Sequence, residues 1–224
     1  MERPFIVVSS VSDDPFAIDV SHYFGQAAEI SDLIALKRFA NSEFCPRFIS
    51  DETDFDRIGR NLQGTSVVIV SACCGEHTRN ALAMRTCLVA RAAKDNGAER
   101  VILVEPDLFF SAQDRGPRPD HGKTDFPRQL ADYKKFDGQP FSSRLYAQLL
   151  KASGIDEVLT VHNHSLTVQR LFADEFPQGF HNLNPAELFA EYLMSDEMGN
   201  VISHGRPIAL CAPDAGAEAF VRAV

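Results

Sequence analysis

Short runs of apolar residues recur along this chain and alternate with segments of helical pattern. The runs are residues 5–10 (FIVVSS), 66–71 (SVVIVS), 100–105 (RVILVE) and 157–161 (EVLTV). A strand with no polar face needs cover on both sides, which is typical of the parallel sheets of α/β proteins. We therefore expect an α/β fold with a mainly parallel sheet, flanked by helices and joined by right-handed crossovers.

Helices are expected between these strands. They span residues 13–24, 80–96, 142–153 and 184–193. Gly25, Gly97 and Gly154 directly follow the first three helices, where glycine commonly ends a helix. No internal repeat or low-complexity stretch interrupts the alternation.

Two segments depart from this alternation. Residues 33–39 and 44–49 flank a short polar stretch, 40–43, and this pattern predicts a strand, a tight turn and a second strand. The tract from Gly116 to Pro140 is rich in proline, aspartate and basic residues and is longer than most loops. We expect it to be a mobile or inserted surface element.

The C-terminal segment predicts an apolar strand and only a short helix to cover it. Residues 207–212 (PIALCA) form an apolar run that predicts a last strand, and a short apolar helix should follow from Ala217 to Val224. A helix of about two turns is too short to be stable by itself. We therefore expect the chain to be the N-terminal part of a larger fold, either cut short or completed by something else.

Charge and cysteine content limit the partners and the compartment. The net charge is −9 and the basic residues form no long run, so no nucleic-acid partner is expected. No apolar run approaches the roughly 20 residues of a membrane span, and the N-terminus lacks a signal-peptide core. The five cysteines include no CxxC pair, which predicts reduced, mostly buried thiols in a cytoplasmic protein.

Ligands of parallel α/β folds lie beyond the carboxyl ends of the strands. The segments that follow the expected strands are therefore the candidate site. They are residues 71–77, 106–115, 162–164 and 213–216.

Two of these segments carry candidate metal ligands. Strand alternation would place the imidazoles of His162 and His164 on one face, where they could bind a divalent metal or a phosphate oxygen. Asp214 could face both a metal and a phosphate. The alternatives stay open: a strand end with hydrogen-bonded histidines, and an aspartate that caps a helix.

Two other groups suit a nucleotide. Phe39, Asn41 and Glu43 place a ring, an amide and a carboxylate on one turn, where they could stack on a purine and read its amino edge; a surface hairpin with a buried Phe39 is the alternative. Arg115, two residues after Gln113, could clamp a phosphate or form a solvated ion pair with its neighbour Asp114.

Five segments, in chain order, resemble the ribose-phosphate pyrophosphokinase family. They are Lys37–Glu43 (KRFANSE), Gln113–Arg115 (QDR), Gln139–Leu145 (QPFSSRL), Val158–His164 (VLTVHNH) and Ala212–Gly216 (APDAG). The resemblance implies two related phosphoribosyltransferase-like domains: an ATP-side domain at 1–182 and the beginning of a second one at 183–224. It also implies homo-oligomers, either dimers or hexamers.

The family's activity implies the substrates and the roles of the matched residues. The family moves a diphosphoryl group from MgATP to ribose 5-phosphate, giving phosphoribosyl pyrophosphate for nucleotide biosynthesis. The resemblance assigns adenine and ribose binding to Phe39, Asn41 and Glu43, often in a neighbouring subunit's site. It assigns ATP contacts to Gln113 and Arg115, and the Mg²⁺–triphosphate to His164 and Asp214. It gives no residue of this chain a catalytic role.

The chain departs from the family pattern at several places. Ala112 replaces an arginine, His162 replaces an aspartate that Mg²⁺ would favour as an oxygen ligand, and the tract 116–140 is longer than the family's. No segment supplies the catalytic Lys-Arg loop or the acidic ribose-phosphate loop, so we expect this chain alone to be inactive. A non-catalytic regulatory or assembly relative is the alternative, and a small metal-dependent hydrolase using His162 and His164 is a third hypothesis.

Overall fold

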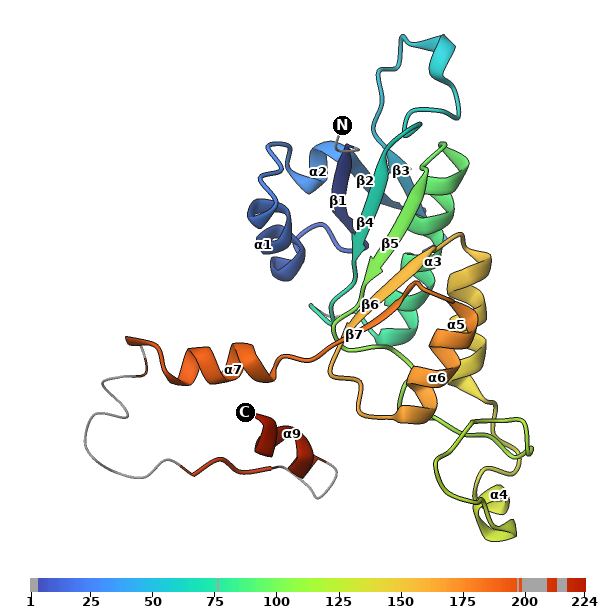
Figure 1. Cartoon of the computed structure of the whole chain (residues 1–224). Coiled ribbons are helices and arrows are strands. Elements are labelled where there is room, and N and C mark those ends of the chain that lie inside the picture. Colours follow the sequence, from blue (N-terminus) through green and yellow to red (C-terminus); the bar gives the residue numbers. More distant parts are fainter. Residues whose placement is uncertain (1–3, 76, 197, 199–208, 213–216) are drawn as a thin grey trace.

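The computed structural model of the chain describes residues 4–75, 77–196, 198, 209–212 and 217–224 (Figure 1). Its centre is a five-stranded parallel sheet in the order β1-β4-β5-β6-β7. The strands are β1 (Phe5–Ser9), β4 (Ser66–Val70), β5 (Arg100–Val104), β6 (Glu157–Val161) and β7 (Phe180–Leu183). A separate antiparallel pair consists of β2 (Ile34–Arg38) and β3 (Phe44–Phe48). The expected α/β fold with a parallel sheet flanked by helices is confirmed.

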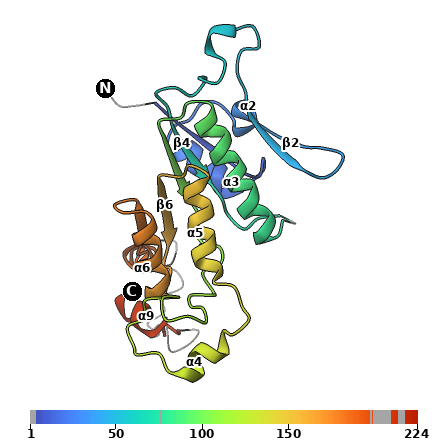
Figure 2. The same cartoon turned by 90° about the vertical axis from the view of Figure 1, so that its right-hand side faces the viewer.

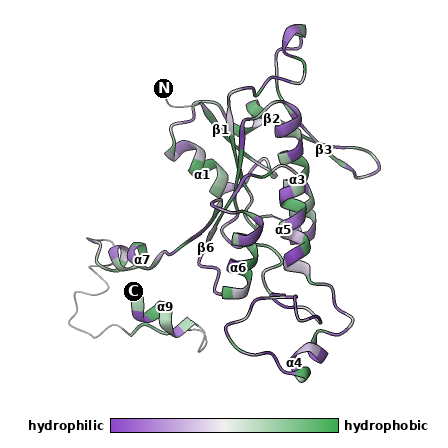
Figure 3. Cartoon of the chain, turned by 45° about the vertical axis from the view of Figure 1, so that its right-hand side comes forward, coloured by the Kyte–Doolittle hydropathy of each residue, from purple (hydrophilic) through white to green (hydrophobic). Residues whose placement is uncertain are grey.

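Helices lie on both faces of this sheet. The described part of the chain contains the helices α1 (Pro15–Tyr23), α2 (Ile30–Leu33), α3 (Arg79–Asp95), α4 (Leu130–Lys135), α5 (Ser142–Ala152), α6 (Leu166–Glu175), α7 (Ala186–Leu193) and α9 (Glu218–Ala223), with a 3-10 turn η1 at Phe55–Arg57. Helix α1 covers one face, and α3 and α5 cover the opposite face (Figures 1 and 2). Hydrophobic and hydrophilic residues stand side by side on α3 and α5, as expected of helices with one face on a sheet (Figure 3).

The strands are buried as their apolar sequences predict. Val67, Ile69 and Val70 of β4 are fully buried, as are Val101 and Leu103 of β5. Burying side chains of this kind contributes about 1.5–3 kcal/mol each to folding. Strands β4 and β5 therefore form the centre of the hydrophobic core, and the loops that follow them start from well-packed strands.

Side-chain caps fix where the main helices begin. Asp14 is fully buried and accepts hydrogen bonds from the backbone N–H groups of Phe16 and Ala17 at the start of α1. Thr78 and Ser165 cap α3 and α6 in the same way. Gly97 and Gly154, which follow α3 and α5, have φ values of +87° and +97°, a region that glycine tolerates best.

Several elements differ from the sequence expectation. Helix α6 and strand β7 were not expected: β7 reads Phe-His-Asn-Leu, with no apolar run, and forms because β6 offers it a free edge. The expected strand at 207–212 is wrong for the part that the structure describes, because residues 209–212 form no strand. The division into domains 1–182 and 183–224 stays a prediction.

The structure also tests the expectation that the cysteines are mostly buried. All five cysteines are free, but only Cys87 is buried, so the expectation of mostly buried thiols is wrong. Cys73, in the loop after β4, is exposed, whereas Cys74 is half-buried against the core. Burial raises the pKa of the Cys87 thiol and keeps it protonated.

Within the described residues, no helix has both the length and the apolar character needed to cross a lipid bilayer.

Candidate functional site

The candidate site is the carboxyl edge of the parallel sheet. Since β4, β5 and β6 are neighbours and run parallel, the loops that follow them start from the same edge. These loops carry the segments 71–77, 106–115 and 162–164 that the sequence singled out. Residues 213–216 lie outside the described residues, and so does the candidate ligand Asp214.

The turn between β2 and β3 presents the candidate purine-binding side chains to solvent. The turn is closed by hydrogen bonds from Phe39 N–H to Glu43 O, 2.8 Å, and from Ser42 N–H to Phe39 O, 2.9 Å. Asn41 Oδ1 accepts from Glu43 N–H at 3.1 Å. Phe39 is 41% exposed, so the alternative of a hairpin with this ring buried does not hold. Lys37 Nζ lies over this ring, 4.9 Å from its centroid.

A hollow of about 760 Å³ lies between this hairpin and α3. Its lining includes Arg38, Glu43, Phe44, His77, Arg85 and Leu88. The guanidinium of Arg85 lies 4.3 Å from the centroid of Phe44, and its Nη1 lies 2.6 Å from His77 Nε2. Burial lowers the pKa of Arg85, and Arg38 adds to this effect. Sequence reasoning missed Arg85; His77 lay within a segment it had singled out.

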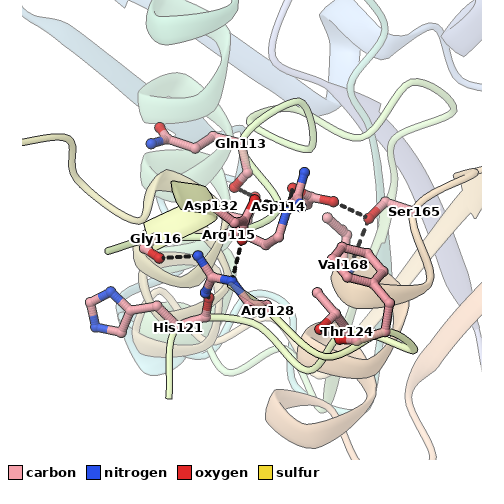
Figure 4. A network of polar contacts seen from close by, with 12 residues as sticks. Gln113, Asp114, Arg115, Gly116, His121, Thr124, Arg128, Asp132, Ser165 and Val168 are labelled. Carbon is pink, nitrogen blue, oxygen red and sulfur yellow. Dashed lines mark hydrogen bonds and ion pairs between the residues drawn. The ribbon is translucent and has the colours of Figure 1, made fainter. Parts of the chain in front are cut away.

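The loop after β5 is tied into a network rather than left free. Gln113 accepts from Ser142 Oγ at 2.9 Å and donates from Nε2 to Gln139 Oε1 at 3.1 Å. Arg115 Nε lies 3.0 Å from Asp114 Oδ1, and its side chain is 21% exposed (Figure 4). The ion pair that the sequence offered as an alternative therefore forms, although it is partly buried rather than solvated. The proposed ATP contacts of Gln113 and Arg115 stay a prediction.

Beneath this loop lies a buried acid that sequence reasoning did not single out. Glu105 follows β5 directly, is fully buried, and accepts hydrogen bonds from Phe109 N–H and Tyr146 Oη, both at 2.8 Å. Burial raises the pKa of Glu105 to about 8, which outweighs the opposite effect of these two donors. The side chain therefore holds a proton at neutral pH. Nothing in the local sequence distinguishes it from an exposed glutamate at a strand end.

The turn after β6 is held by amide side chains. Asn163 N–H donates to Asn182 Oδ1 at 2.8 Å, and the Asn163 carbonyl accepts from Gln169 Nε2 at 2.6 Å. Strand β6 ends at Val161, and His162 has a φ of +49°, so the expected strand alternation does not extend through His164. The ring centroids of His162 and of Phe220 in α9 lie 4.1 Å apart, and both His162 and His164 are exposed.

These residues do not by themselves assemble a magnesium site. Mg²⁺ prefers oxygen ligands in octahedral geometry, and His164 offers nitrogen. Within the described part of the chain, no group of three or more His, Cys, Asp or Glu side chains could hold a metal ion. That finding also leaves the hydrolase hypothesis without a metal cluster among the described residues.

The parallel sheet, the helices on both faces and the loops beyond the strand ends define an α/β protein whose candidate site lies at the carboxyl edge of the sheet. A family model described as the N-terminal domain of ribose phosphate pyrophosphokinase matches residues 7–123, just over half of the chain. The chain therefore belongs to this family. The matched region contains both the turn at 39–43 and the loop at 113–115.

The fold is also similar to a solved structure. The crystal structure of phosphoribosylpyrophosphate synthetase from Mycobacterium smegmatis matches 98% of this chain, with a TM-score of 0.69 and 18% sequence identity. At this identity the similarity shows the fold. The match covers 59% of the mycobacterial chain, so this chain spans well under two thirds of that protein's length.

Proposed function

We propose that this chain binds MgATP at the carboxyl edge of its sheet as a homologue of ribose-phosphate diphosphokinase. That reaction moves the β,γ-diphosphoryl group of MgATP to the 1-hydroxyl of ribose 5-phosphate and gives phosphoribosyl pyrophosphate. Displacement in line at phosphorus asks the protein mainly to position the reactants and to neutralise charge. Mg²⁺ enters with ATP as part of the substrate.

One observation supports this proposal above the others. The turn at 39–43 lies in the region that matches the family, and it exposes the Phe39 ring beside the side chains of Asn41 and Glu43. A ring can stack on a purine, and an amide and a carboxylate can pair with its amino edge. In a homo-oligomer of the proposed kind, this hairpin serves the site of a neighbouring copy.

The phosphates are assigned to the loops beyond β5 and β6. Gln113 and Arg115 supply donors from the first loop, and His164 supplies an exposed imidazole from the second. Asp214 completes this set in the proposal. The proposal gives no residue a catalytic role, because the chain contributes groups that bind and orient the nucleotide.

Calorimetric titration of the purified chain with MgATP tests the nucleotide site. Stacking of a base on an aromatic ring contributes about 1–3 kcal/mol, so Phe39→Ala should weaken binding roughly 5- to 150-fold. Phe55→Ala is the matched control, because Phe55 is 76% exposed and lies in η1, outside the turn at 39–43. Absence of MgATP binding by the wild-type chain at millimolar concentration would exclude the proposal.

Transfer itself is tested separately. We expect residues 1–224 alone to produce no phosphoribosyl pyrophosphate from MgATP and ribose 5-phosphate, because none of their segments resembles the family's catalytic loops. Phosphorus NMR measures product formation, and robust product formation by the purified chain would contradict this expectation.

A non-catalytic regulatory or assembly relative is the second candidate. It is favoured by Ala112, which replaces a cation of the family pattern, and by His162, which replaces an aspartate whose oxygen Mg²⁺ would prefer as a ligand. The same titration separates the candidates. Micromolar MgATP binding argues against a dead site, whereas stable association with an active diphosphokinase in the absence of nucleotide binding supports the second candidate.

A further inference from the structure

The tract 116–140 is built around a buried arginine. The side chain of Arg128 is 3% exposed. Its Nη2 donates to Gly116 O at 2.8 Å, and its Nη1 donates to His121 O at 3.0 Å and to Arg118 O at 3.3 Å. A guanidinium removed from water in this way is stable only when its donors are satisfied and its charge is matched. The tract is therefore folded around Arg128.

Asp132 supplies the charge that matches Arg128, and it also contacts Arg115. One carboxylate oxygen pairs with Arg128 Nε, and the other lies 3.0 Å from Arg115 Nη1. The carboxylate thus joins two guanidinium groups, one in the tract and one in the loop after β5 (Figure 4). Aromatic rings add support: Tyr133 lies 4.2 Å from Arg128 Cζ and Phe136 lies 5.2 Å from Arg115 Cζ.

The chain of contacts continues to the neighbouring strand end. Arg115 Nε pairs with one oxygen of Asp114, and the other oxygen of Asp114 accepts from Ser165 Oγ at 3.1 Å. Ser165 follows His164 directly and caps α6. Charges alternate in sign along Arg128, Asp132, Arg115 and Asp114, so each ion is neutralised by the next.

We propose that Asp132 is a positioning residue that holds Arg115 for the triphosphate of a bound nucleotide. Two carboxylates fix the Arg115 guanidinium through Nε and Nη1, and no described residue accepts a hydrogen bond from its Nη2. A long side chain that is already ordered loses less freedom when an anion binds. This inference rests on the proposed MgATP site and assigns a role to the tract 116–140.

Titration with ATP and with adenosine tests the role of Asp132. Asp132→Asn keeps the shape of the side chain and removes its charge. It should weaken ATP binding by about 10-fold or more and adenosine binding by less than about twofold, because the proposal places Arg115 at the phosphates, which adenosine lacks. Asp132→Glu should recover much of the ATP affinity. Equal losses for both ligands, or no loss for ATP, would overturn the proposal.

The control is the same substitution just beyond the end of α4. Asp137 forms an exposed ion pair with Lys134, and Asp137→Asn should leave both affinities unchanged. If Asp132→Asn does not fold, the double variant Asp132→Asn/Arg128→Met removes the buried cation together with its partner and should show the same selective loss. Full ATP affinity in that double variant would equally overturn the proposal.

Hydrogen exchange of the nucleotide-free chain separates this proposal from the proposed function. In Asp132→Asn, the backbone amides of residues 113–116 should exchange faster, while those of β1 should not change. If the wild-type chain binds no ATP, the proposed function fails. If it binds ATP and Asp132→Asn changes neither ATP affinity nor exchange, the nucleotide site stands and the role of Asp132 is refuted.

Discussion

Ser165 Oγ donates a hydrogen bond to Asp114 Oδ2 at 3.1 Å, across 51 residues of sequence. The same hydroxyl accepts from Val168 N–H at 3.3 Å and thereby caps α6. One small side chain therefore joins the loop after β5 to the helix that follows the exposed His164. The Asp114 carboxylate also lies at the N-terminal end of α6, where the helix dipole favours a negative charge.

Ser165→Ala should destabilise the chain. It removes the α6 cap and leaves one oxygen of Asp114 without its donor, and loss of a cap typically costs about 1 kcal/mol. Urea unfolding followed by circular dichroism measures the change. Ser165→Thr retains the hydroxyl and should lose less than half as much; an equal loss would show that the hydroxyl is not responsible.

Glu105 should make stability depend on pH. Its pKa is raised to about 8 in the folded chain, so its contribution to stability is fully present below the unfolded pKa of 4.5 and is lost as pH rises through 8. Across this window each pH unit costs up to about 1.4 kcal/mol. Glu105→Gln remains neutral, so the variant should gain stability relative to wild type between pH 5 and pH 8.5 in urea unfolding. A difference that does not change with pH would contradict a buried, protonated Glu105.

Tyr146→Phe should destabilise the folded chain through the same acid. The substitution removes the donor to Glu105 Oε1 while leaving the ring in place, and an unsatisfied buried acceptor costs about 1–3 kcal/mol. Thermal unfolding at pH 6 and at pH 8.5 should show a larger loss at the higher pH, where the acid is ionised. Tyr23→Phe is the matched control, because Tyr23 is 87% exposed.

Ala112→Arg should strengthen MgATP binding. Ala112 is exposed one residue before Gln113, and a cation there would face the same phosphates that the proposal assigns to this loop. A charge-assisted contact of about 1.4 kcal/mol or more corresponds to at least a tenfold gain in affinity by calorimetry. Ala112→Gln is the control of similar length without charge, and an equal gain from it would argue against an electrostatic cause.

The sequence predicted those elements whose burial can be inferred from a short local pattern, such as an apolar run or a glycine after a helix. The apolar runs at 66–71 and 100–105 became the central strands, and Gly97 and Gly154 stand where α3 and α5 end. Strand β7 was missed because only pairing with β6 makes it a strand, and pairing is not visible in four mixed residues.

The same distinction applies to the candidate site: the residue types were recognised from the sequence, whereas their exposure and backbone conformation were not. The turn at 39–43 was recognised from its residue types, but the exposure of Phe39 was decided by the packing of the hairpin. His162 was expected in a strand, and its positive φ ends that alternation.

The sequence by itself determined the alternation of strands and helices, because apolar periodicity and glycine placement act between residues close together in the chain. Only the tertiary structure decided which charges meet. Asp132 pairs with Arg115, and Ser165 with Asp114, because folding brings them within hydrogen-bonding distance. Electrostatic and hydrogen-bond energies depend on separation in space and on removal from water, and neither quantity is fixed by position along the chain.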